Sequence, residues 1–378
     1  MKSFRWAAIG VAAAAVLAAC GGSDDNKVNF TQTVSFGDSV SDVGTYQVGT
    51  VAALGGGKFT VNGPAGKVWT EDLAAAVGTP AQCAARTGLL PNDPQVTGAP
   101  VQDFPNCFNY AEGSARVTSE GSGPNGVALQ QSLGQVNLGL MADSLHEQFT
   151  RHLAKVGSYS GLELVTVNAG GNDLFMQLTA VGQAAGGGQA AAATAAVAGW
   201  SPAVIAIVTG GGQAAVDAAS AAAVAAMGQA GVELVADIKS LVLGKGARYV
   251  VVRNLTDINL TPFGLTLDAS TQGLITAMTN AFNTALSTGL AGSVVLFDDY
   301  AQTHAIAANP SAYGFSNVTT PACGPNAFNG EALVCNTTNL IAGDTSKYAF
   351  ADDVHPTPFA HQGTADAALA LIMQAGWR

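Results

Sequence analysis

The chain alternates short apolar runs with segments whose apolar residues recur at helical spacing. The apolar runs have the length and bounding turns of buried strands, and they lie at 27–37, 108–115, 162–168, 248–255 and 293–300. Helices are predicted at 68–77, 127–156, 232–241, 271–289 and 358–377. Strands that alternate with helices form a mostly parallel sheet covered on both faces. The sequence therefore predicts an α/β fold, a three-layer α/β/α sandwich around a mostly parallel central sheet of about five strands.

Three of the predicted strands lead directly into turns of small and polar residues, which hold Ser39, Gly113 and Asn172. Because the active groups of parallel sheets lie at the carboxyl ends of strands, we expect these residues to share one site. Gly37 lets the backbone bend sharply, so Ser39 is expected at the start of a helix as a candidate nucleophile. The alternative is an ordinary strand-to-helix turn in which Asp38 or Ser39 is the N-cap.

A serine nucleophile needs a base, and His355 is the candidate because a carboxylate precedes it in a loop, whereas His146 and His152 lie on a predicted helix. Asp352 precedes His355 by three residues, in a loop before the last predicted helix. One turn of such a loop brings the carboxylate onto the imidazole Nδ1–H, which fixes the tautomer and leaves Nε2 to face Ser39. The alternative is a loop with capping acids at a helix N-terminus. The remaining histidines are expected to be exposed, packed or in loops: His146, His152, His304 and His361.

Together these motifs resemble the four blocks of the GDSL esterase/lipase family, also called SGNH hydrolases, from about residue 30 to the end. The blocks are Gly37-Asp38-Ser39 with Ser41-Asp42, the run 109–116, the run 170–173 and Asp352-x-x-His355-Pro356. The resemblance implies a flavodoxin-like fold with Ser39 as nucleophile, His355 as base and Asp352 as the acid that orients it.

The resemblance also implies an oxyanion hole formed by the backbone N–H groups of Ser39 and Gly113 and the side-chain amide of Asn172. The second block usually contains Gly-Gly, whereas this chain has Gly113-Ser114. The N–H of either residue is therefore a candidate donor, and Gly113 is the favoured one.

The family implies an esterase or lipase that hydrolyses carboxylic esters through an acyl-enzyme, without a metal ion or organic cofactor. A phospholipase, a lysophospholipase or an acyltransferase would use the same site. A surface-binding module without activity would be expected to have lost Ser39, His355 or Asn172, and all three are present. A metal-dependent hydrolase is disfavoured because the sequence shows no cluster of histidine and carboxylate ligands.

The first twenty residues have the pattern of a bacterial lipoprotein signal. A short basic region precedes an apolar run, and Leu-Ala-Ala-Cys ends it at Cys20. We expect a signal peptide at 1–19, lipidation of Cys20 and a flexible tether over 20–29. Gly21 follows the cysteine, which by resemblance favours the outer membrane as the location of this exported, lipid-anchored protein. The alternative is a plain secreted protein with an incidental cysteine.

Charge and length bound the remaining possibilities. The formal net charge is −11, which argues against nucleic acid or an anionic surface as the main partner. The 378 residues allow one large domain or two small ones, and we expect a single domain over 30–378. An Ala/Gly-rich insertion at about 178–231 is predicted to be helical, with a mobile cover over the site as the alternative. The oligomeric state is not indicated.

Four cysteines remain after Cys20, an even number that suggests two disulfides in an exported protein. Sequence proximity favours Cys83–Cys107 and Cys323–Cys335 among the three possible connectivities. A zinc site is the weaker alternative, since no Cys-x-x-Cys pair or nearby histidine accompanies these cysteines.

Overall fold

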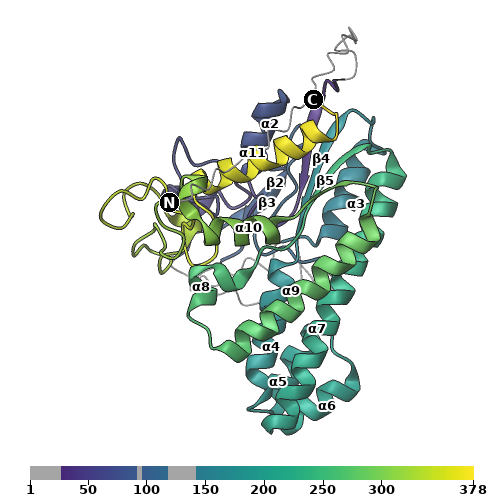
Figure 1. Cartoon of the computed structure of the whole chain (residues 1–378), viewed down its shortest axis with the longest axis vertical. Coiled ribbons are helices and arrows are strands. Elements are labelled where there is room, and N and C mark those ends of the chain that lie inside the picture. Colours follow the sequence, from purple (N-terminus) through teal and green to yellow (C-terminus); the bar gives the residue numbers. More distant parts are fainter. Residues whose placement is uncertain (1–26, 92–95, 118–141) are drawn as a thin grey trace, which may run out of the picture.

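The protein is built around a parallel sheet of four strands (Figure 1). The computed structural model describes residues 27–91, 96–117 and 142–378. The sheet order is β1–β4–β5–β6, with β1 at Gln32–Phe36, β4 at Glu163–Asn168, β5 at Tyr249–Arg253 and β6 at Val295–Phe297. Its register aligns Asn168 with Arg253 and Arg253 with Phe297, so the carboxyl ends of the strands meet at one edge. The parallel α/β architecture is confirmed.

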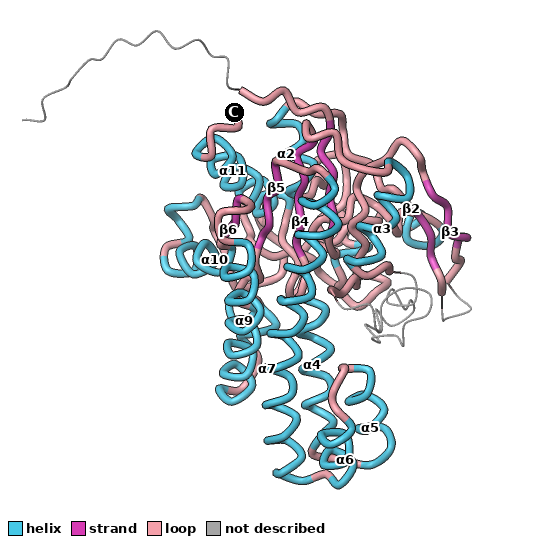
Figure 2. Tube along the Cα trace, turned by 90° about the vertical axis from the view of Figure 1, so that its right-hand side faces the viewer, coloured by secondary structure: helices cyan, strands magenta, loops and turns pink. Residues whose placement is uncertain are grey.

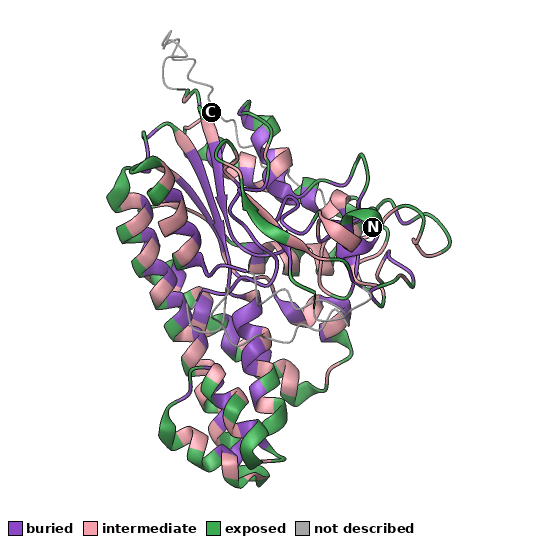
Figure 3. Cartoon of the chain, turned by 180° about the vertical axis from the view of Figure 1, so that it is seen from behind, coloured by how far each residue is buried: buried purple, intermediate pink, exposed green. Residues whose placement is uncertain are grey.

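Helices cover both faces of this sheet, which gives the three layers. Along a strand successive side chains point to opposite faces, so Val251 packs into one apolar cluster while Val250 and Val252 pack into another. The cluster around Val251 lies under α2 (Trp69–Val77) and α11 (Pro358–Gln374). The opposite cluster is formed with α3 (Leu145–Val156), α7 (Gly212–Asp237) and α9 (Ala269–Leu290). Figure 3 shows the strands as the most completely buried part of the chain.

The predicted strand at 108–115 is not a strand in the structure. Ser35 of β1 exchanges backbone hydrogen bonds with Phe108 and Tyr110, but only an isolated bridge, Ser35 to Asn109, results. The Asn109 side chain donates to the Ser41 carbonyl, and the chain then turns at Gly113. The predicted strand is therefore replaced by isolated bridges of Asn109 to Ser35 and Ala84, and the described part of the sheet has four strands against the five expected.

The shorter elements lie at the edges of the sandwich. An antiparallel pair, β2 (Arg86–Leu89) with β3 (Ala99–Asp103), lies in a region where neither a strand nor a helix was predicted. The short helices are α1 (Gly49–Ala53), α8 (Pro262–Leu265) and α10 (Asp299–Ala308). A π-helix at Ile238–Val242 continues α7, and 3₁₀ turns lie at Leu243–Lys245, Ile258–Leu260, Pro310–Tyr313 and Ala332–Val334. The helix predicted at 127–156 is seen from Leu145, and its part before 142 lies outside the described residues.

The Ala/Gly-rich segment is helical and extends away from the sheet (Figure 2). It contains the end of α4 (Gly171–Ala184), then α5 (Gly188–Val197), α6 (Pro202–Gly210) and most of α7. Its small residues let helices approach closely: a Cβ at Gly231 of α7 would lie 2.8 Å from the Ala285 Cβ of α9. Length and composition alone would let the stretch Gly212–Lys245 cross a membrane, a property shared by core helices of soluble proteins.

Both expected disulfides are present. Cys83 is bonded to Cys107, and Cys323 is bonded to Cys335. The proposed signal peptide and Cys20 lie outside the described residues.

Candidate active site

Ser39 lies in a single turn directly after β1. The Ser41 N–H donates to the Asp38 carbonyl at 3.0 Å, and no helix follows, in contrast to the expected helix start. The Asp38 carboxylate accepts from the Val40 N–H at 3.1 Å and from the Asn168 side-chain amide at 2.8 Å. Because Asn168 ends β4, Asp38 fixes the serine turn to the neighbouring strand.

Ser39, His355 and Asp352 form a continuous hydrogen-bonded chain. The Ser39 Oγ lies 2.9 Å from His355 Nε2, and His355 Nδ1 lies 2.8 Å from Asp352 Oδ2. Asp352 also accepts the backbone N–H groups of Val354, His355 and Ala332, at 3.0, 2.7 and 2.8 Å. The loop that carries the acid and the base thus holds the Asp352 carboxylate with its own N–H groups. The arrangement of the three side chains is the one that activates a serine.

The surroundings of Asp352 and His355 favour an ionised carboxylate beside a basic imidazole. Burial would raise the pKa of Asp352, but His355 and the N–H groups of Val354 and His355 hold it below its ordinary value. Burial would lower the pKa of His355, but the carboxylates of Asp352, Glu331 and Asp38 raise it above its ordinary value. The Asp352 carboxylate is therefore placed to stabilise a positive charge on the His355 imidazole.

The second block does not present the Gly113 N–H to the site. This N–H donates to the Asp42 carboxylate at 2.9 Å, which ties the second block to the serine turn. A Cβ at Gly113 would lie 2.3 Å from the Phe59 ring, so packing requires glycine there. The favoured donor of the sequence analysis is thus already occupied, because a buried carboxylate requires hydrogen-bond donors.

The next residue fits the role of a backbone donor better. Ser114 is buried and has a φ of 74°, a left-handed conformation that is uncommon outside glycine. Its backbone N–H makes no hydrogen bond within the described chain, and its Oγ likewise has no partner. A strained residue that leaves an N–H open is typical of functional sites.

Asn172 lies in the first turn of α4, directly after β4. Its side-chain amide donates to the Ala115 carbonyl at 2.9 Å, so α4 is joined to the end of the second block. Asn172, Ser39 and His355 line one cavity of about 90 Å³ at the carboxyl edge of the sheet. The structure therefore brings together the residues expected from the first, third and last blocks.

Two carboxylates near the site were not among the functional residues predicted from the sequence. Asp42 accepts three backbone N–H groups, and burial raises its pKa to about 6. A carboxylate oxygen of Glu331, a carboxylate oxygen of Asp352 and a ring nitrogen of His355 all lie within 4.8 Å of one another. Burial and the nearby Asp352 raise the Glu331 pKa to about 7. Asp42 had a signal in the first block, whereas nothing in the sequence near Glu331 marks it.

The other histidines do not join the triad. His146 pairs with Asp237 at 3.0 Å, and His304 pairs with Asp257 at 2.9 Å. His152 and His361 are buried in the packed interior. Within the described ranges, the group Glu331, Asp352 and His355 is the only one with donors spaced for a metal ion, and its imidazole Nδ1 already bonds the Asp352 carboxylate.

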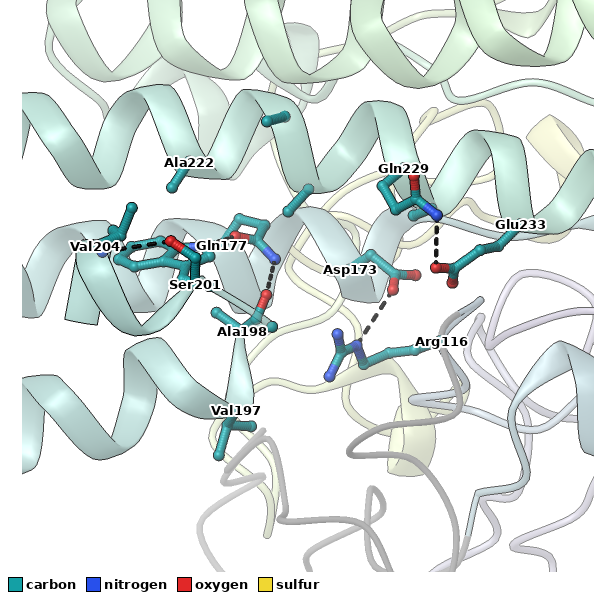
Figure 4. A pocket seen from close by; sticks show the side chains of 15 residues that line it. Arg116, Asp173, Gln177, Val197, Ala198, Ser201, Val204, Ala222, Gln229 and Glu233 are labelled. Atoms are coloured by element: carbon teal, nitrogen blue, oxygen red, sulfur yellow. Dashed lines mark hydrogen bonds and ion pairs between the residues drawn. The ribbon is translucent and has the colours of Figure 1, made fainter.

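A larger cavity, of about 670 Å³, lies further along α4 and does not include Ser39 or His355 (Figure 4). Its polar side chains are bonded to protein groups: Gln177 accepts from the Trp200 indole at 2.6 Å and donates to the Ala198 carbonyl at 2.9 Å. Arg116 and Asp173 form an ion pair at its other end, at 3.2 Å. This cavity is thus separate from the one that Ser39 and His355 line.

Comparison with known proteins agrees with this geometry. A family described as GDSL-like Lipase/Acylhydrolase matches residues 34–368. A GDSL esterase/lipase of Arabidopsis thaliana is 31% identical over 127 residues, which is 31% of this chain and 34% of that protein. A second GDSL esterase/lipase of the same plant is 33% identical over 79 residues, 21% of this chain and 22% of that protein. The matched stretches therefore span about a third or less of these relatives. Since the family match covers most of the chain, the protein belongs to the GDSL lipase/acylhydrolase family.

Proposed function

We propose that this protein is a serine esterase that hydrolyses carboxylic esters through a Ser39–His355–Asp352 triad. Membership of the GDSL family indicates a hydrolase that acts on esters. The observation that carries the serine mechanism is the unbroken chain from Ser39 Oγ through the imidazole to Asp352, with contacts of 2.9 and 2.8 Å.

The proposed reaction has two halves. His355 accepts the Ser39 proton as Oγ attacks the ester carbonyl carbon, and Asp352 stabilises the imidazolium. When the tetrahedral intermediate collapses, the bond to the alcohol oxygen breaks and His355 donates the proton to that oxygen. Water then attacks the acyl-enzyme, His355 accepts a proton from it, and the carboxylic acid leaves as Ser39 regains its hydrogen.

The negative oxygen of the tetrahedral intermediate needs fixed donors. We assign this role to the Ser39 N–H, the Asn172 amide and the Ser114 N–H in place of that of Gly113. The assignment rests on the open Ser114 N–H and on the donation of the Gly113 N–H to Asp42. Such donors stabilise charge most where water is excluded, and all of these residues are buried.

The test is hydrolysis of p-nitrophenyl acetate by the wild-type protein and by Ser39→Ala. We expect turnover by the wild type and its loss in the variant, with the circular dichroism spectrum and melting temperature unchanged. Equal turnover by wild type and Ser39→Ala would refute the mechanism.

We further propose that the protein is exported and anchored in a bacterial outer membrane through lipidated Cys20. The lipoprotein-like residues 1–20 and the two disulfides support this location. Metabolic labelling with a radioactive fatty acid should label the wild type and not Cys20→Ser. Equal labelling of both proteins would contradict the anchor.

A further inference from the structure

A second cavity continues from the catalytic cavity along the carboxyl edge of the sheet. It has a volume of about 250 Å³ and lies between the end of β5, α10, α11 and the loops around Phe315 and Phe350. The catalytic cavity and this groove share five lining residues, so the two are contiguous: Val40, Arg253, Thr256, Asp299 and Val354. Val40 directly follows Ser39 in the chain and is one of the shared residues, so the groove adjoins the cavity that Ser39 lines.

The walls of the groove are mainly apolar. Phe315 and Phe359 meet edge to face at 5.1 Å and form one wall, and Ile306 and Ala307 of α10 line another part. The lining also has polar side chains, among them Gln302, Thr303 and Asp366, and Asp366 is exposed and bonded to the Gln362 side chain. An apolar concave surface beside a few convergent polar groups is typical of a ligand site.

The charged residues at the junction neutralise one another. Arg253 and Asp299 are both buried, and the Arg253 Nη2 lies 2.7 Å from the Asp299 carboxylate. A hydrocarbon chain that passes this pair therefore meets no net charge, whereas a charged group would have to be desolvated without a free counter-ion.

From this geometry we infer that the groove binds the aliphatic acyl chain of the ester substrate and makes the enzyme selective for medium-length acyl groups. The inference rests on the proposed esterase function. In esters with one long hydrocarbon chain, that chain is usually the acyl part while the alcohol part carries hydroxyl or other polar groups. The groove is smaller than the roughly 300–1,000 Å³ of sites for drug-sized ligands, so it fits a single chain.

Burial of each methylene group is expected to raise kcat/KM about fourfold while the groove has space, from the transfer free energy of a buried CH₂. For the wild type, p-nitrophenyl octanoate should therefore be a much better substrate than the acetate. Chain length on the alcohol side, tested with ethyl to octyl acetates, should change kcat/KM less than about twofold.

The test is a bulky side chain at Ala307, with Ala305 as the matched control on the same helix. Ala307 lines the groove, whereas Ala305 is exposed and does not. Ala307→Trp should lower kcat/KM for the octanoate at least tenfold and leave the acetate within about twofold. Ala305→Trp should leave both substrates unchanged. Ala307→Leu adds a smaller side chain and should lower kcat/KM for the octanoate by an intermediate amount. It replaces the Trp variant in the test if that variant does not fold.

The outcomes separate the two proposals. If the wild type hydrolyses neither ester, the esterase function itself fails. If the wild type hydrolyses acetate but Ala307→Trp and Ala307→Leu affect acetate and octanoate equally or not at all, the acyl groove is refuted. A dependence on the alcohol chain in place of the acyl chain would also overturn the assignment.

Discussion

The Cys323–Cys335 disulfide should support catalysis as well as stability. The loop that it closes carries Ala332, whose backbone N–H donates to the Asp352 carboxylate at 2.8 Å. The Cys323 N–H also donates to the Ala351 carbonyl at 2.8 Å, next to the triad acid. Replacing both cysteines by alanine removes the covalent constraint on this loop and leaves the triad residues themselves unchanged.

The other disulfide, Cys83–Cys107, provides a control because its removal should lower the stability by a similar amount. The cysteines are 12 residues apart in Cys323–Cys335 and 24 apart in Cys83–Cys107, so chain entropy gives each bond about 3 kcal/mol. Among the described residues no hydrogen bond joins Cys83 or Cys107 to a triad residue, and the backbone after Cys107 is also held by Ser35 of β1. The two double alanine variants should therefore lose similar stability but different activity.

The expected loss of activity follows from the hydrogen bond that the loop supplies. A hydrogen bond to a charged group contributes roughly 1.5–3 kcal/mol, so its loss should lower kcat/KM by about tenfold to a hundredfold in Cys323→Ala/Cys335→Ala. Cys83→Ala/Cys107→Ala should stay within about threefold of wild type. The assay is p-nitrophenyl acetate hydrolysis well below both melting temperatures. Equal activities in two variants that are both folded would refute the supporting role of the loop.

Three further predictions concern the base and the two proposed oxyanion donors. The neighbouring carboxylates raise the pKa of His355, so kcat/KM should fall as the pH drops through a value above 6.5, because the protonated ring accepts no proton. Glu331→Gln removes one of these charges and should move this acid limb to lower pH. An unchanged pH profile would contradict the coupling. Ser114→Gly keeps the backbone N–H and relieves the left-handed strain, so activity should persist while the free energy of unfolding rises by about 1 kcal/mol. Steady-state kinetics and urea denaturation measure these two quantities. Loss of activity in this variant would argue against the Ser114 N–H as a donor. Asn172→Ala should lower kcat about a hundredfold to a thousandfold in steady-state assays, and a kcat near wild type would remove the amide from the oxyanion hole.

The elements that the sequence predicted well are those with local signals. Apolar runs that end in turns located the four strands, and the three-residue spacing of Asp352 and His355 located a pair that the structure joins at 2.8 Å. The disulfide pairs were also predictable, because cysteines close in sequence lie in the same loop regions.

What the sequence could not show depends on contacts between distant segments. The run after Phe108 is apolar enough for a strand, but the side-chain bond of Asn109 to Ser41 and the turn at Gly113 limit its pairing to isolated bridges at Asn109. Motif resemblance favoured Gly113 as donor, whereas the Asp42 carboxylate decides which N–H stays open. The apolar groove is formed by several segments that meet only in the fold, so no pattern along the chain reveals it.

The central claim is that Ser39 attacks the substrate and carries the acyl group. A fluorophosphonate, which reacts with activated serines, should add one equivalent to the wild-type protein in intact-mass spectrometry. Peptide mapping should place the adduct on Ser39, and neither Ser39→Ala nor His355→Ala should be labelled at a comparable rate. An adduct on another residue, or ester turnover that persists in Ser39→Ala, would contradict the account.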